Sequence, residues 1–111
     1  SSDLTPVKTA DKDAYLRCAQ AAAPIFKEFG ALAVVENWGA DIRDGKHTDF
    51  KMAVKLEPDE TVVLSWIIWP DKATGDAAEK KMMEDPRFHE MEMPFDGKRM
   101  VVGGFETIFE A

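Results

Sequence analysis

The spacing of apolar residues near the start of the chain predicts an amphipathic helix over residues 11–29. Intervals of three and four place one set of side chains on a single helical face, namely Tyr15, Cys18, Ala19, Ala22, Phe26 and Phe29. Thr9 or Asp11 can cap the start of this helix, and Gly30 supplies a left-handed end. Because Pro24 lacks the amide that would bond to a carbonyl one turn earlier, we expect a kink or break there.

Other runs have the composition of strands. Four are expected to form a sheet: residues 4–7, 31–38, 61–69 and 100–109. Residues 51–56 have the composition of a further short strand. Pro6 assigns the first run to a sheet edge or a strand end, because proline cannot donate to the ladder. Gly103 and Gly104 indicate a bulge or a close backbone approach in the last run.

The run 61–69 is apolar on both of its faces. Side chains alternate along a strand, so Val62, Leu64, Trp66 and Ile68 point one way, and Val63, Ser65, Ile67 and Trp69 point the other. The neighbours of Trp66 on its face predict that this side chain is fully buried.

A second helix is predicted from Asp71, which can cap it, to about Asp85, where Pro86 ends it. Ala78 and Met82 lie on its inner face, and residues 39–48 and 88–98 are expected to be loops. The order strand, helix, strand, strand, helix, strand is typical of the α+β class, as a ferredoxin-like βαββαβ unit with an antiparallel sheet. We expect residues 1–111 to form one such domain.

Two helices can cover only one face of this sheet. The other face would then expose an apolar patch of roughly several hundred Å², which soluble monomers avoid. The simplest cover is a second copy of the chain packed sheet against sheet, so the sequence predicts a two-fold homodimer.

The composition narrows the classes of partner. Of 111 residues, 45% are hydrophobic and 32% are charged, which suits a globular chain and neither a disordered tail nor a membrane span. The 14 Lys and Arg residues against 21 Asp and Glu residues give a net charge of -7, so we expect no nucleic-acid partner. A single cysteine and the absence of a basic-then-apolar leader favour the cytoplasm and no membrane.

Several blocks resemble those of one known bacterial family. They are Gly30-Ala31-Leu32 with Glu36, residues 45–50, the strand from Glu60 to Ile67, the Asp85-Pro86-Arg87 turn, residues 93–100, and Gly103-Gly104-Phe105-Glu106. The pattern is similar to the YbaA-like family, domain of unknown function family 1428, over nearly the whole chain. The resemblance implies a dimeric α/β barrel, and the family has no accepted catalytic residues to transfer.

Two glutamates within apolar runs are the first candidates for chemistry. By alternation Glu36 shares a face with Val34 and Trp38, and Glu106 shares one with Val102 and Ile108. Each carboxylate either forms a structural ion pair, with Lys98, Arg99 or Lys55 as partner, or acts as a general acid or base in a dry pocket. The ion pair is favoured over catalysis, because structural ion pairs outnumber catalytic acids. For Glu106 we also predict that the carboxylate lies at the mouth or floor of a pocket.

Aromatic and polar residues suggest where a ligand would bind. Trp38 and Trp66 either line a site for a flat apolar molecule or, more commonly, pack in the core or an interface. Asn37 beside Trp38, with His47 nearby, is similar to the residue set of cofactor-free monooxygenases that share the dimeric barrel, an analogy of fold only. Arg99, next to Lys98, can hold a small anion or form a solvated strand edge.

The sequence offers little for metals or cofactors. The segment from His89 to Met93 contains soft donors, yet methionine far more often fills apolar gaps. No paired-ligand spacing suits zinc, and Gly103 with Gly104 lacks the helix that follows a phosphate loop. We therefore expect no metal and no cofactor. The sequence favours a cytosolic homodimer that binds a small metabolite, with a cofactor-free monooxygenase-like or isomerase-like enzyme acting on a small apolar or aromatic substrate as the alternative.

Overall fold

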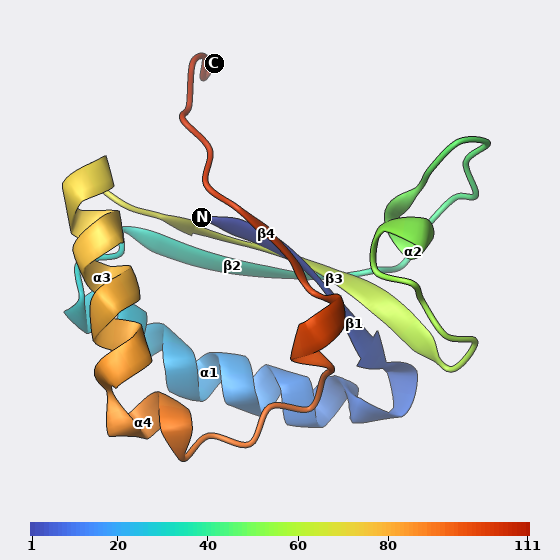
Figure 1. The fold of residues 1–111 in the computed structure, drawn as a ribbon, viewed down its shortest axis with the longest axis horizontal. Helices are drawn as coiled ribbons and strands as arrows, with labels where there is room; N and C mark the ends of the chain where they lie inside the picture. Colours follow the sequence, from blue (N-terminus) through green and yellow to red (C-terminus); the bar gives the residue numbers. More distant parts are fainter.

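A computed structural model describes residues 1–111 and combines one antiparallel sheet with several helices (Figure 1). In chain order the elements are β1 (Ser2–Lys8), α1 (Lys12–Glu28), β2 (Ala33–Trp38), α2 (Phe50–Ala53), β3 (Glu60–Ile68), α3 (Lys72–Glu84), α4 (Pro86–His89) and β4 (Val101–Gly103). Short 3-10 turns at Thr9–Asp11 and Gly97–Arg99 precede α1 and β4.

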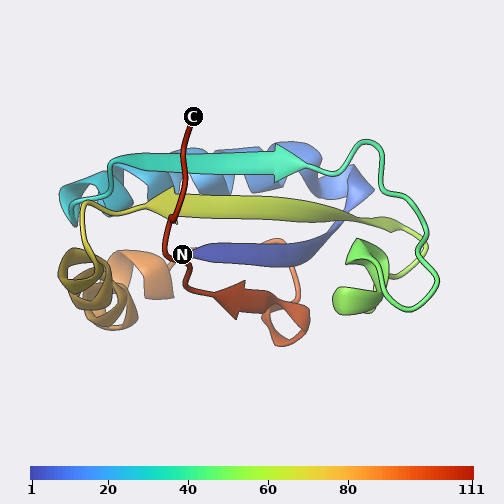
Figure 2. The same cartoon turned by 90° about the horizontal axis from the view of Figure 1, so that it is seen from above.

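The four strands lie in the order β2-β3-β1-β4, and every neighbouring pair is antiparallel (Figure 2). The long strand β3, rich in β-branched residues, is paired on both sides. Strand β4 pairs only with Ser2, Asp3 and Leu4, so at Pro6 the strand β1 has β3 as its one neighbour. The proline amide, which cannot donate a hydrogen bond, is tolerated in an inner strand for that reason.

Helix α1 lies along one side of the sheet, and α3 stands at one end of the sheet and leads to α4 on the side of α1 (Figure 1). The short helix α2 lies on the other side of the sheet, at its opposite end. The side chains of Thr5, Val7 and Val63 point toward the long helices and are buried. Ala22 and Ile25 of α1 and Ala78 of α3 complete this layer of the core. The predicted first helix, α1, therefore covers this face of the sheet.

The opposite side of the sheet, which we call the open face, is apolar and partly bare. The strand registers place on it Leu4, Val35, Leu64, Trp66, Ile68 and Val101. Ile68 is 47% exposed and Val101 is 43% exposed. Trp66 is only partly buried, so its predicted complete burial within the chain is wrong. The reason is that no long helix reaches this face.

Local signals defined most element ends correctly. The predicted first helix becomes α1, and Gly30 follows it in the left-handed region with φ 108°. Asp71 caps α3 by accepting a hydrogen bond from the Thr74 amide at 2.7 Å, and Pro86 follows its end. Asp11 occupies the position before α1 but makes no capping bond with its side chain. Helix α1 continues through Pro24 to Glu28, so the predicted break is absent.

Three predicted segments differ in the structure. Residues 51–56 do not form a strand: the Asp49 carboxylate accepts from the Met52 amide at 2.7 Å and starts the helix α2 instead. The predicted loop 88–98 contains the end of α4 and the start of the 3-10 turn Gly97–Arg99. The last strand stops at Gly103, because no strand lies beside residues 104–109 to pair with them.

None of the helices combines the length and apolar character needed to cross a bilayer.

Replacing Gly30 tests the helix end. A Cβ at this residue would lie 2.7 Å from Thr74 Cγ2, and the backbone there has positive φ. We expect Gly30→Ala to lower the free energy of unfolding by about 1–2 kcal/mol. Urea unfolding at one fixed protein concentration measures this loss. Gly97→Ala is the matched control, because its new methyl would meet nothing within 4 Å. Equal stability of Gly30→Ala and the parent would contradict a left-handed backbone in close contact with Thr74 at this helix end.

Candidate functional site

Three adjacent strands place polar side chains in one row beneath α1. Asp3 of β1 lies opposite Ser65 of β3, and Ser65 lies opposite Glu36 of β2. Directly paired residues point to the same face of a sheet, so all three side chains face the helices. Tyr15 reaches this row from the first half of α1. We call these four residues the carboxylate–hydroxyl cluster.

Glu36 is the acceptor at the centre of the cluster. The Tyr15 hydroxyl donates to Glu36 Oε2 at 2.7 Å, and the Ser65 hydroxyl donates to the same oxygen. The Tyr15 and Ser65 hydroxyl oxygens are 3.5 Å apart. One carboxylate oxygen of Glu36 therefore accepts hydrogen bonds from two hydroxyl groups that come from different elements, α1 and β3.

Burial changes from the floor of the cluster to its rim. Ser65 is 6% exposed, Asp3 and Tyr15 are partly buried, and Glu36 is exposed. Burial raises the pKa of the Asp3 carboxyl above its ordinary value, and the Glu36 charge raises it further, although hydroxyls of Ser65 and Thr5 oppose the change. Burial also raises the pKa of the Tyr15 phenol. The cluster thus combines a carboxyl group that resists ionisation with a second carboxylate at the rim.

Aromatic rings lie on either side of Tyr15. Its ring centroid is 6.4 Å from that of Trp38 and 6.1 Å from that of Phe95. The Lys12 ammonium lies 5.7 Å from the centre of the Trp38 ring, a cation–π contact. Cys18 lies one turn further along α1, and burial raises the pKa of its thiol. The surroundings of the carboxylates are therefore largely aromatic.

Glu36 is the predicted candidate that the structure brings into this cluster, with Trp38 beside it. The expected ion pair of Glu36 with a lysine or arginine is wrong, because its hydrogen-bond partners are Tyr15 and Ser65. No ion pair in the structure involves Glu36. Of the basic partners predicted for it, Arg99 pairs with Glu60 and Asp96 instead.

Two other predicted binding residues lie on the open face. The Asn37 side-chain amide donates to the Leu64 carbonyl at 2.9 Å, and Trp66 lies opposite Val35. Asn37 also lines a groove of about 220 Å³ with Trp38, Ile42, Phe50 and Leu64. Asn37 and Trp66 are therefore separated from the carboxylate–hydroxyl cluster by the sheet.

Glu106 and His47 lie outside both regions. Glu106 is exposed in the segment after β4, and Ile108, which was expected to keep water from it, is 92% exposed. Glu106 is therefore open to water within the chain and is not shielded as predicted, because its segment has no neighbouring strand. His47 is exposed in the loop before α2.

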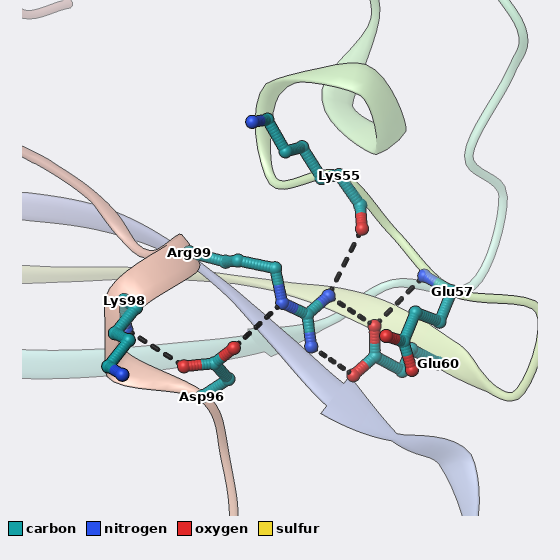
Figure 3. Close-up of polar contacts among 6 residues, drawn as sticks. All are labelled: Lys55, Glu57, Glu60, Asp96, Lys98 and Arg99. Atoms are coloured by element: carbon teal, nitrogen blue, oxygen red, sulfur yellow. Dashed lines mark hydrogen bonds and ion pairs between the residues drawn. The ribbon is translucent and has the colours of Figure 1, made fainter.

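Arg99 holds the start of β3 to the turn before β4 (Figure 3). It donates to both carboxylate oxygens of Glu60, at 2.7 and 2.8 Å, to Asp96 at 3.0 Å and to the Lys55 carbonyl at 3.1 Å. Lys55 has a positive φ of 50°, so this contact supports a strained backbone position. Hydrogen bonds from Arg99 lower the pKa of Glu60 and of Asp96. The guanidinium predicted to hold a ligand is taken up by contacts within the chain.

Asp3, Tyr15 and Ser65 were missed as site residues. Ser65 was visible as a small polar residue inside an apolar strand, and Tyr15 as the one hydroxyl on the apolar face of the first helix. Asp3 carried no signal, because its importance depends on the register of β1 against β3. Strand pairing over more than 60 residues of sequence brings these groups together.

Removing the charge of Asp3 tests the environment of the cluster. Its raised pKa means that the folded state gains stability from the protonated acid, and this gain is lost as pH rises through the folded pKa. We expect Asp3→Asn to be more stable than the parent at pH 7, with a difference that shrinks toward pH 3.8, the ordinary value. Thermal unfolding across this pH range measures it. Asp41→Asn, in an exposed loop, serves as the control and should lack this dependence.

The contacts of Arg99 with Glu60 predict the opposite dependence of stability on pH. Because the pKa of Glu60 is lowered, its stabilising effect is present above its ordinary value of 4.5 and is lost as pH falls through the folded pKa. Glu60→Gln should therefore be less stable than the parent at pH 7, and the two should converge below pH 4.5. Chemical unfolding at several pH values measures this, with exposed Glu92→Gln as the control. A gap that stays constant with pH would exclude a charged pair.

Comparison with known proteins places the chain among uncharacterised relatives. The family model described as "Protein of unknown function (DUF1428)" matches residues 2–97. The protein named "Uncharacterized protein YbaA" from Escherichia coli K12 is 60% identical over 109 residues, covering 96% of this chain and 93% of the relative. The protein of the same name from Shigella flexneri shows the same identity and coverage. With the family model matching most of its length, the chain belongs to the DUF1428 family.

Proposed function

We propose that this protein is a cytoplasmic homodimer that binds a small molecule at the carboxylate–hydroxyl cluster. The observation that carries the proposal is Glu36, which has two hydroxyl donors, Tyr15 and Ser65, and no basic partner. A carboxylate at a rim, next to a carboxyl whose pKa burial raises, is unusual for a purely structural group and typical of a binding or reaction site.

The chemistry of the cluster favours one class of ligand. Two carboxyl groups and no hydrogen-bonded cation select against anions and favour a molecule with N–H or O–H donors. Trp38 and Phe95 flank Tyr15 and offer faces for an apolar or aromatic body. A small aromatic compound that carries an amine, amide or hydroxyl group fits both features. No cofactor is part of this proposal.

The element order supports a ferredoxin-like domain over residues 1–111. With the one-turn helices α2 and α4 set aside, the helices and strands follow the order β1, α1, β2, β3, α3, β4, and β1 and β3 are the inner strands. The open face supports pairing of two such domains into a dimeric α/β barrel, because its tryptophan and aliphatic side chains are partly exposed in one chain. The unpaired Cys18 is consistent with a reducing cytoplasm.

A second candidate function is proton-transfer catalysis without a cofactor, in a monooxygenase-like or isomerase-like enzyme. The observation that favours it is the hydrogen-bonded set of Tyr15, Ser65 and Glu36 beside Asp3, since a carboxyl group with a raised pKa retains a proton at higher pH than usual. Glu36 would take a proton from the substrate in this mechanism, and Asp3 would supply one. The same ligand class suits both functions.

Ligand binding distinguishes the cluster from a structural contact. Small aromatic amines, amides and phenols are screened by thermal shift, because a ligand that binds only the folded state raises the melting temperature. We expect a compound that binds the parent to lose affinity by about tenfold or more in Tyr15→Phe and Glu36→Gln, whose folds are retained. Asn37→Ser, on the other side of the sheet, is the control and should bind as the parent does.

Turnover separates the two candidate functions. A compound that binds the parent and is recovered unchanged supports the binding protein, whereas oxygen uptake or isomerisation that is lost in Glu36→Gln supports the enzyme. Equal affinity of the parent and both cluster variants would contradict a ligand site at Glu36.

A further inference from the structure

We propose that the segment after β4, residues 104–111, is a clasp that packs against a second copy of the chain. This inference rests on the proposed homodimer and names the part of the chain that stabilises it. Three large apolar side chains of the segment are almost fully exposed: Phe105 at 79%, Ile108 at 92% and Phe109 at 83%. We call residues 104–111 the C-terminal arm.

The arm leaves the body of the protein on the side of the open face. Figure 1 shows it rising from the end of β4, away from the helices α1, α3 and α4. No side chain of the arm takes part in a hydrogen bond or ion pair with the rest of the chain. Together with the exposure of Phe105, Ile108 and Phe109, this means that the rest of the chain does not cover the apolar residues of the arm.

The arm has the pattern of a strand with one apolar edge. In an extended segment side chains alternate, so Phe105, Thr107 and Phe109 share one side, and Ile108 lies on the other side between Glu106 and Glu110. Such an edge suits a segment that lies along another protein surface with its carboxylates in water. The strand composition that predicted a longer β4 is explained in this way, with the pairing surface supplied from outside the chain.

The buried area favours a second copy as the partner. Two phenylalanine side chains bury roughly 150–250 Å² each. Two arms with four such rings, added to the exposed apolar atoms of two open faces, approach the roughly 1,200–2,000 Å² of a stable interface. Each copy provides both the arm and the face on the same side, which is the self-complementary surface that a two-fold dimer requires.

The length of the arm agrees with this geometry. Eight extended residues span at most roughly 26–29 Å, while two packed sheets lie about 10 Å apart. An arm that rises from one open face is therefore long enough to cross the interface and continue along the partner. Any second copy that covers the open face must meet this arm, because the arm projects from that side of β4.

Sedimentation equilibrium of full-length chains tests the clasp. We expect the parent to have about twice the mass of one chain, and the variant with Phe105→Ser and Phe109→Ser to have a dimer dissociation constant raised by about a hundredfold or more. The matched control, Glu106→Gln with Glu110→Gln, changes the polar edge of the same arm and should leave the dissociation constant within about threefold. Met83→Ser, which removes a 72% exposed apolar side chain on α3, should also leave it unchanged.

Isotope-filtered NMR on mixed dimers shows which chain the arm contacts. With one labelled and one unlabelled copy, we expect contacts between the Phe105 and Phe109 rings and the other copy. A monomeric parent overturns both the homodimer and the clasp. A parental dimer whose dissociation constant is unchanged by the two serine substitutions overturns the clasp alone, as do arm contacts found only within one chain. Failure of ligand binding at Glu36 affects neither result.

Discussion

The sheet carries apolar side chains on both faces, while its long helices pack on one of them, and this asymmetry governs the rest of the structure. On the covered side, Val7 and Val63 lie in a core that includes α1 and α3. On the open face, Trp66 and Ile68 remain partly in water. A chain of this size has too few helices to bury both faces, so one face stays partly exposed within the chain.

The same asymmetry positions the carboxylate–hydroxyl cluster. Side chains of β1, β2 and β3 that point toward α1 are otherwise apolar or small, and Asp3 and Glu36 interrupt that layer on either side of Ser65. A partly buried carboxyl group lowers the stability of a fold unless it is compensated, and the raised pKa of Asp3 reflects that cost. Natural proteins tolerate such groups mainly where they bind or react.

The contrast with Arg99 shows how environment separates similar residues. Asp96 and Glu60 face a guanidinium that donates to both, and their pKa values are lowered. Asp3 faces another carboxylate and hydroxyl groups, and its pKa is raised. The first arrangement stabilises the connection between β3 and the turn before β4, whereas the second leaves a carboxyl group with a raised pKa facing α1.

Helix ends that depend on local backbone chemistry could be predicted from the sequence alone, namely the cap at Asp71 and the left-handed Gly30. The two apolar faces of β3 could also be predicted, because side chains alternate along a strand. The family could also be inferred from its sequence blocks. The row of Asp3, Ser65 and Glu36 could not, because the register of strands far apart in the chain decides which side chains meet. The arm had the composition of a strand, yet a strand forms only where a neighbour supplies the other half of its hydrogen bonds. Only the tertiary structure shows that residues 104–111 have no such neighbour within the chain.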